Sequence, residues 1–119
     1  MRGYYQDLLV WQKSMNLVYE VYRVVKLLPK EELYALSSQI RRAAVSIPSN
    51  IAEGHQRKTI NEFVNFLFIA KGSNAELQTQ LLICEVLNYL SPEQTQSAKA
   101  LSKEVEKMLT SLIHSFENE

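Results

Sequence analysis

Few residues in this chain combine the type and the spacing that catalysis or metal binding requires. The two histidines, His55 and His114, lie far apart in the sequence, so they do not form the closely spaced pair expected of a helix-borne metal site. The sequence also lacks a glycine-rich phosphate loop and the sharp Gly-x-Ser-x-Gly turn that presents a nucleophile. We therefore expect neither an enzyme nor a bound metal or cofactor.

Two adjacent arginines, Arg41 and Arg42, stand in an otherwise apolar helical segment. Neighbouring residues of a helix point about 100° apart, so we expect one of the two side chains to turn toward the interior. Glu76 is the expected partner of the inward arginine, and Asn74 lies beside it in the sequence. Arg42, Asn74 and Glu76 would then form a polar layer that fixes helix register. We favour this structural role over a catalytic one.

A second polar group connects two predicted helices and consists of His55, Gln56, Arg57 and Lys58. Cations beside the free N–H groups of a helix start can bind phosphate. The alternative is that these side chains are only solvated. If nucleic acid is bound, the candidate basic residues are Arg41, Arg42, Arg57, Lys58, Arg23 and Lys26.

The charge of the whole chain neither requires nor forbids nucleic-acid binding. Thirteen basic and thirteen acidic side chains balance, which removes the strongly basic signature of an independent nucleic-acid binder. Residues 1–60 nevertheless hold nine basic and five acidic side chains, and the remainder holds four and eight. Either the two halves pair within the fold, or one basic face stays exposed.

Length and composition predict one domain, residues 1–119, in a reducing compartment. The length suffices for an independent core. The single cysteine, Cys84, lies in an apolar run and is expected to be buried. Polar residues interrupt every apolar stretch before the roughly 18 residues of a membrane span. We expect a cytoplasmic protein.

The apolar residues repeat at helical spacing along nearly the whole chain, and its few Gly and Pro residues divide it into four helices at about 7–28, 33–53, 60–90 and 92–116. Thr59 with Glu62, and Ser91 with Gln94, match the capping-box pattern of a helix start. Short connections make neighbouring helices antiparallel. The predicted fold is an all-α, up-down-up-down four-helix bundle.

The first predicted helix has a wider apolar surface than one bundle seam needs. We assign to the core its stripe Leu8, Trp11, Met15, Val18, Tyr22 and Val25. A second stripe contains Leu17, Val21, Val24 and Leu28, and it is a candidate oligomer interface because surplus apolar surface usually meets a partner. The alternative is that both stripes contact neighbouring helices within one bundle.

Three segments resemble a known family: DLLVWQKSMNL at residues 7–17, QIRRAAVSIPSNIAEG at residues 39–54 and GSNAEL at residues 72–77. They are similar to the four-helix bundle proteins encoded in intervening sequences of bacterial 23S ribosomal RNA genes. That resemblance implies a ring-like homo-oligomer, a pentamer, as in the related accessory proteins of diversity-generating retroelements. Those relatives engage nucleic acid through a basic surface, which implies RNA or DNA as a partner.

Two functional hypotheses follow from the sequence. In the first, a homo-oligomer repeats the basic residues around a symmetry axis and holds phosphates, although aromatic residues for base stacking do not alternate with them in the sequence. In the second, the bundle is a scaffold for a protein partner without nucleic acid, with contacts made by the second stripe and by Tyr4, Tyr5 and Tyr19.

Overall fold

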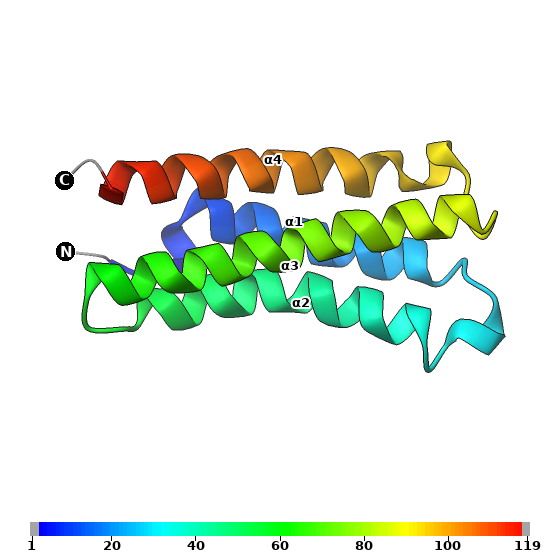
Figure 1. Ribbon diagram of the computed structural model, residues 1–119, viewed down its shortest axis with the longest axis horizontal. Coiled ribbons are helices and arrows are strands. Elements are labelled where there is room, and N and C mark those ends of the chain that lie inside the picture. The colour runs from blue at the N-terminus through cyan, green and yellow to red at the C-terminus, as the bar shows by residue number, and fades with distance from the viewer. Residues whose placement is uncertain (1–2, 118–119) are drawn as a thin grey trace.

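The computed structural model describes residues 3–117, and helices are the only regular elements among them. The long helices are α1 Leu9–Val25, α2 Leu36–His55, α3 Ile60–Val86 and α4 Pro92–Glu117, and two short 3-10 helices, η1 Tyr5–Asp7 and η2 Lys30–Glu32, precede α1 and α2. The connections alternate between the two ends of a bundle of 46 × 23 × 19 Å, so successive helices run in opposite directions (Figure 1). The predicted all-α four-helix bundle is confirmed.

The four helices occupy the corners of a square. Helix α1 contacts α2 and α4, and α3 also contacts α2 and α4, whereas no contact joins α1 to α3 within residues 3–117. In Figure 1, α3 crosses the front of the molecule and α1 lies behind it. The outward surfaces of α1 and α3 therefore face away from each other.

Local signals explain where the helices begin and end. Ser91 and Gln94 bond each other's backbone N–H groups at 2.9 and 3.2 Å, as the capping box predicts. At the start of α3, Thr59 accepts a hydrogen bond from the Glu62 N–H at 3.1 Å, which is one half of its predicted capping box. Helix α3 ends at Val86, before the predicted residue 90, because Asn88 adopts the left-handed conformation with φ 61°.

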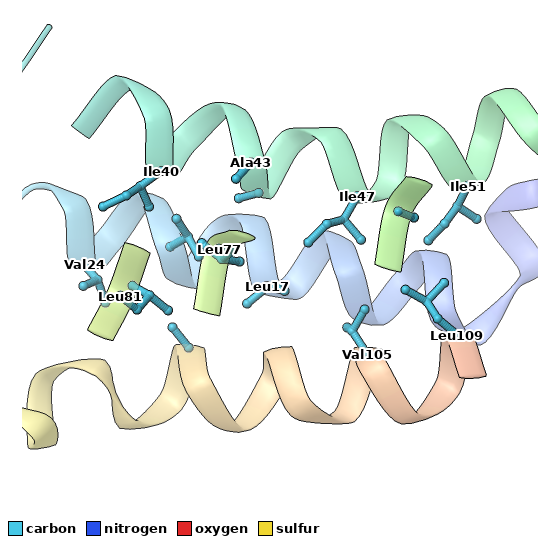
Figure 2. Packing of buried hydrophobic residues seen from close by; sticks show 14 of the residues in the cluster. Leu17, Val24, Ile40, Ala43, Ile47, Ile51, Leu77, Leu81, Val105 and Leu109 are labelled. Atoms are coloured by element: carbon cyan, nitrogen blue, oxygen red, sulfur yellow. The ribbon is translucent and has the colours of Figure 1, made fainter. Parts of the chain in front are cut away.

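The core contains apolar side chains from all four helices, among them Leu17, Ile47, Leu77 and Val105, which point into the space between the helices (Figure 2). The second stripe of α1 is its core stripe, so the assignment of the core to the first stripe was wrong. The alternative, in which both stripes contact neighbouring helices within one bundle, holds for much of the first stripe, because Val25 is buried and Leu8, Trp11 and Val18 pack against the core. Met15 and Tyr22, which were expected inside, are exposed.

The residues expected to form an oligomer interface, Leu17, Val21, Val24 and Leu28, are only 0 to 9 % exposed within a single chain. They belong to a heptad-spaced stripe that also contains Ser14, and this serine conceals the pattern in the sequence. Ser14 is fully buried because its hydroxyl donates a hydrogen bond to the Trp11 carbonyl at 2.7 Å. These positions are therefore unavailable to a partner.

Helix α2 continues as one helix through Pro48 and Gly54, although the sequence placed its end at residue 53. Gly54 is buried, and a Cβ atom there would lie 2.4 Å from the Phe66 Cβ of α3. The glycine therefore permits close approach of the two helices rather than ending α2. No helix of the described part of the chain is long and apolar enough to cross a membrane.

Candidate nucleic-acid interface

The six basic residues singled out from the sequence do not form one patch. Arg57 and Lys58 lie in the α2–α3 connection, at the end of the bundle that also holds both chain termini (Figure 1). Arg23 and Lys26, at the end of α1, and the arginine pair near the start of α2 lie toward the opposite end. A single chain thus has two separate basic regions.

Two contacts within the chain account for the position of the Arg57 side chain without a ligand. Its guanidinium lies 4.8 Å from the centre of the Phe66 ring, and it approaches the Glu53 carboxylate at 4.0 Å. These contacts join the end of α2 to the start of α3. Lys58 is exposed. Phosphate binding by this connection stays a prediction.

The opposite end gathers cations around an aromatic ring. A hollow of about 400 Å³ is lined by Tyr22, Lys26, Lys30 and Arg41, and a neighbouring hollow shares Tyr22 and Arg41 and adds Arg42. We call these five residues the Tyr22 cluster. No acidic residue lines either hollow. Tyr22 is 41 % exposed, so a flat ligand can reach its ring.

Two nearby carboxylates, those of Glu20 and Glu32, are engaged outside the Tyr22 cluster, whereas Glu31 is exposed beside Lys30. Glu32 accepts a hydrogen bond from the Tyr89 hydroxyl at 2.9 Å, which ties η2 to the α3–α4 connection. Glu20 binds Arg23 one helical turn away, and this pairing raises the pKa of the arginine. Arg23, a predicted phosphate ligand, is therefore already ion-paired, whereas the cations of the Tyr22 cluster face the two hollows.

Two members of the Tyr22 cluster were missed by sequence reasoning. Tyr22 was assigned to the core because its spacing fits an apolar stripe, and Lys30 lies in a segment interpreted only as a connection. Only the fold brings η2 beside the first turns of α2, where Lys30 and Arg41 line the same hollow. This packing places the ring of Tyr22 beside the basic side chains, although aromatic residues do not alternate with them in the sequence.

The predicted polar layer exists, but with different partners. Asn74 is buried, donating a hydrogen bond to the Ser102 carbonyl at 2.8 Å and accepting one from the Ser102 hydroxyl at 2.6 Å. Gln78 also donates to that hydroxyl, at 2.9 Å. The layer therefore joins α3 to α4, and beside it the hydroxyls of Ser73 and Ser46 share a hydrogen bond at 2.8 Å that joins α3 to α2.

The expected pair of Arg42 and Glu76 is wrong. Both side chains are exposed on the outside of α2 and α3, and no ion pair joins them. The cost of removing charges from water favours this outcome, since a neutral amide and a hydroxyl satisfy the interior at a smaller desolvation cost. Arg42 and Glu76 are consequently available to ligands or partners.

Cys84 and His55 are enclosed in the fold, whereas His114 is exposed on α4. Cys84 is buried as predicted, and burial, followed by the charges of Glu32 and Glu85, raises the pKa of its thiol from 9.0 to about 11. His55 is buried in an aromatic cluster, with ring centres 5.6 Å from Phe63 and 6.4 Å from Tyr5. Residues 3–117 contain no group of three side chains able to hold a metal ion.

Comparison with known proteins places these features in a family. A solved structure described as a protein with unknown function from the S23 ribosomal protein family of Bacteroides thetaiotaomicron is similar, with 30% sequence identity and a TM-score of 0.82. The match covers 88% of this chain and 98% of that one. No match was found among curated proteins. Residues 6–111 match the family model described as 23S rRNA-intervening sequence protein. Since that match spans most of the four-helix bundle, the chain belongs to the 23S rRNA-intervening sequence protein family.

Proposed function

We propose that this protein is a non-enzymatic, self-associating helical bundle that binds the phosphate backbone of RNA through the Tyr22 cluster. The observation that carries the proposal is the placement of Lys26, Lys30, Arg41 and Arg42 around the exposed ring of Tyr22, with no carboxylate lining either hollow. Cations that follow a backbone, together with an aromatic platform for a base, are the elements of single-strand recognition. DNA binding would use the same chemistry.

Self-association explains how a neutral chain can bind a polyanion. One cluster of four cations gives a weak contact, but a ring of copies presents the cluster repeatedly along one strand. The resemblance to ring-forming accessory proteins supports a pentamer. The family description, which refers to 23S rRNA, supports RNA as the ligand. The proposed RNA ligand and the free thiol of Cys84 both support a location in the cytoplasm.

The test compares matched charge-neutralising variants at the two ends of the bundle. Lys26→Gln with Lys30→Gln removes half of the cations of the Tyr22 cluster, and Arg57→Gln with Lys58→Gln removes two from the opposite end. Binding to a labelled 20-nucleotide single-stranded RNA is measured by fluorescence anisotropy at several salt concentrations. We expect the first variant to bind at least tenfold more weakly and to reduce the salt slope by about 1 to 2.

The control variant at the opposite end should bind within twofold of the wild type. An equal loss in both variants, or wild-type binding that does not change with salt, would contradict the proposal. Circular dichroism of both variants checks that the fold is retained, which is expected because all four side chains are exposed.

A protein scaffold is the second candidate function, and one observation favours it. Several large apolar side chains of α3 are exposed on the outside of the bundle, where the fold gives them no partner helix.

A further inference from the structure

The part of the chain that brings Lys30 to the Tyr22 cluster has little packing of its own. It consists of residues 29–35, which include η2 and which we call the η2 segment (Figure 1). None of its side chains is buried, and Tyr34 is 92 % exposed. Among the helices of residues 3–117, η2 contacts only α2. Burial of apolar side chains therefore does not explain why the segment lies where it does.

The side chain of Glu32 attaches the η2 segment to the bundle. Its Oε2 atom accepts a hydrogen bond from the Tyr89 hydroxyl at 2.9 Å, and its Oε1 atom accepts one from the Leu36 N–H at 3.3 Å. The first bond reaches the α3–α4 connection, and the second satisfies a free N–H group of the first turn of α2. By contrast, the bond from the Glu32 N–H to the Pro29 carbonyl, at 3.0 Å, lies within the segment.

Tyr89 stands in a firmly held turn. The N–H groups of Tyr89 and Leu90 both donate to the Cys84 carbonyl, at 2.9 and 3.3 Å, as in a capped helix end. Leu90 is buried, and the ring of Tyr89 packs against the hydrophobic core. The hydrogen bond to Glu32, followed by burial, raises the pKa of the Tyr89 hydroxyl. A well-anchored side chain thus holds a poorly packed segment.

Two cations of the Tyr22 cluster depend on the position of the η2 segment. Lys30 belongs to the segment and lines the hollow beside Tyr22. Arg41 belongs to α2, and its guanidinium donates a hydrogen bond to the Leu33 carbonyl at 3.5 Å. A movement of the segment would therefore displace Lys30 and remove the acceptor that orients Arg41.

The hydrogen bond from Tyr89 also keeps a carboxylate away from these cations. Glu32 follows Lys30 by only two residues, yet no ion pair joins them within residues 3–117. Both carboxylate oxygens are engaged by Tyr89 and by the N–H of Leu36. Without the hydroxyl, the carboxylate could pair with Lys30 and compete with a phosphate group.

We propose that Tyr89 is a positioning residue of the RNA site. Its hydroxyl holds the Glu32 carboxylate, and through it the η2 segment, so that Lys30 and Arg41 face the hollow beside Tyr22. This role rests on the proposed function of the Tyr22 cluster and extends that site to the α3–α4 connection. Tyr89 lines neither hollow, so it acts through Glu32 and not by touching the RNA.

Removal of one hydroxyl is the first test. Tyr89→Phe keeps the ring in the core, and Tyr34→Phe is the matched control because its side chain belongs to the η2 segment and is 92 % exposed. Binding to the labelled 20-nucleotide RNA is measured by fluorescence anisotropy. Tyr89→Phe should bind about fivefold more weakly, as the loss of one hydrogen bond predicts. Tyr34→Phe should bind like the wild type, and wild-type affinity of Tyr89→Phe would overturn the proposal.

A double-mutant cycle separates positioning from a general loss of structure. In a Lys30→Gln, Arg41→Gln background the segment no longer places a cation, so Tyr89→Phe should have no further effect on binding. In the Arg57→Gln, Lys58→Gln background, which changes the opposite end, its effect should remain about fivefold. Low salt keeps the weakest binding measurable. An equal effect of Tyr89→Phe in both backgrounds would show a merely structural role and would overturn the proposal.

Replacement of Glu32 tests the sign of the effect. If charge alone mattered, removal of an acidic residue near a phosphate site would strengthen binding. We expect Glu32→Ala to weaken binding instead, because this carboxylate holds the η2 segment. Glu31→Ala removes the exposed neighbouring carboxylate and should bind at least as tightly as the wild type. Tighter binding by both variants would contradict a positioning role.

Hydrogen exchange without RNA distinguishes this proposal from the proposed function. Tyr89→Phe should speed the exchange of the amides of residues 30–36 and leave those of α4 unchanged, whereas Tyr34→Phe should change neither. Unchanged exchange in Tyr89→Phe would overturn the positioning role, whether or not RNA binds. Wild-type protein that binds no RNA would contradict the function proposed for the Tyr22 cluster, while faster exchange in Tyr89→Phe would still show that Tyr89 holds the segment.

Discussion

Tyr22 is the residue that distinguishes a nucleic-acid site from a plain basic patch. Its ring is exposed between the ends of α1 and α2, beside Lys26 and Arg41. Stacking of a base on an aromatic ring contributes about 1–3 kcal/mol, so we predict that Tyr22→Leu weakens binding of single-stranded RNA roughly tenfold. Tyr22→Phe keeps the ring and should bind like the wild type. Anisotropy titrations of the three proteins decide the matter, and equal affinities would mean that the cations act without stacking.

Cys84 offers a prediction about pH. Its thiol has a pKa of about 11 in the fold and of 9.0 ordinarily, so the folded protein keeps the proton to a higher pH than the unfolded chain does. Its contribution to stability is therefore complete below pH 9 and declines between pH 9 and 11. Urea unfolding of wild type and Cys84→Ala should show the difference between them changing only in that interval. A constant difference from pH 7 to 11 would contradict the shift.

The two glycines of the α2–α3 pair are predicted to respond to alanine in opposite ways. At Gly54 a Cβ atom would lie 2.4 Å from Phe66, so Gly54→Ala should destabilise the chain by about 1–3 kcal/mol through overpacking. At Gly72 the space is open, so Gly72→Ala should stabilise a single chain by up to about 1 kcal/mol.

Urea unfolding of the wild type and the two variants, at one fixed low protein concentration, measures both glycine changes. Destabilisation of the chain by Gly72→Ala would contradict the prediction and indicate an internal role for this glycine.

At the scale of elements, the sequence predicted what depends on local chemistry. The number of helices, the capping box at Ser91 and the buried Cys84 follow from spacing and side-chain type alone. The orientation of α1 depended on Ser14, whose burial relies on a hydrogen bond to its own helix. The polar layer at Asn74 was located correctly, but its partner Ser102 comes from a helix that only the packing brings near.

The candidate site was less predictable than the fold for the same reason. Basic residues can be counted in a sequence, but their grouping depends on which helix ends meet. Arg57 and Arg41 are similar in type, yet one lies over Phe66 and the other faces a hollow at the opposite end of the bundle. Lys30 joins the site only because η2 folds back toward α2.

At the scale of the whole molecule, assembly and RNA binding should be coupled through the length of the RNA. One strand that reaches several Tyr22 clusters of a ring binds the second and later clusters at a high effective concentration. An RNA long enough for only one cluster gains nothing from assembly. Leu82 and Val86 are exposed apolar side chains of α3, so Leu82→Glu with Val86→Glu should weaken self-association, which light scattering checks. We predict that the wild type and this monomeric variant bind a 6-nucleotide RNA with similar affinity.

With longer RNA the two proteins should diverge, since only the ring offers neighbouring clusters. The wild type should bind a 40-nucleotide RNA at least tenfold more tightly than the monomeric variant does, in the lower part of the range that multivalency typically gives. Anisotropy at equal chain concentrations measures binding of both lengths of RNA. An equal gain with RNA length in monomer and assembly would show that length acts through additional contacts within one chain, so that the ring contributes nothing to RNA binding.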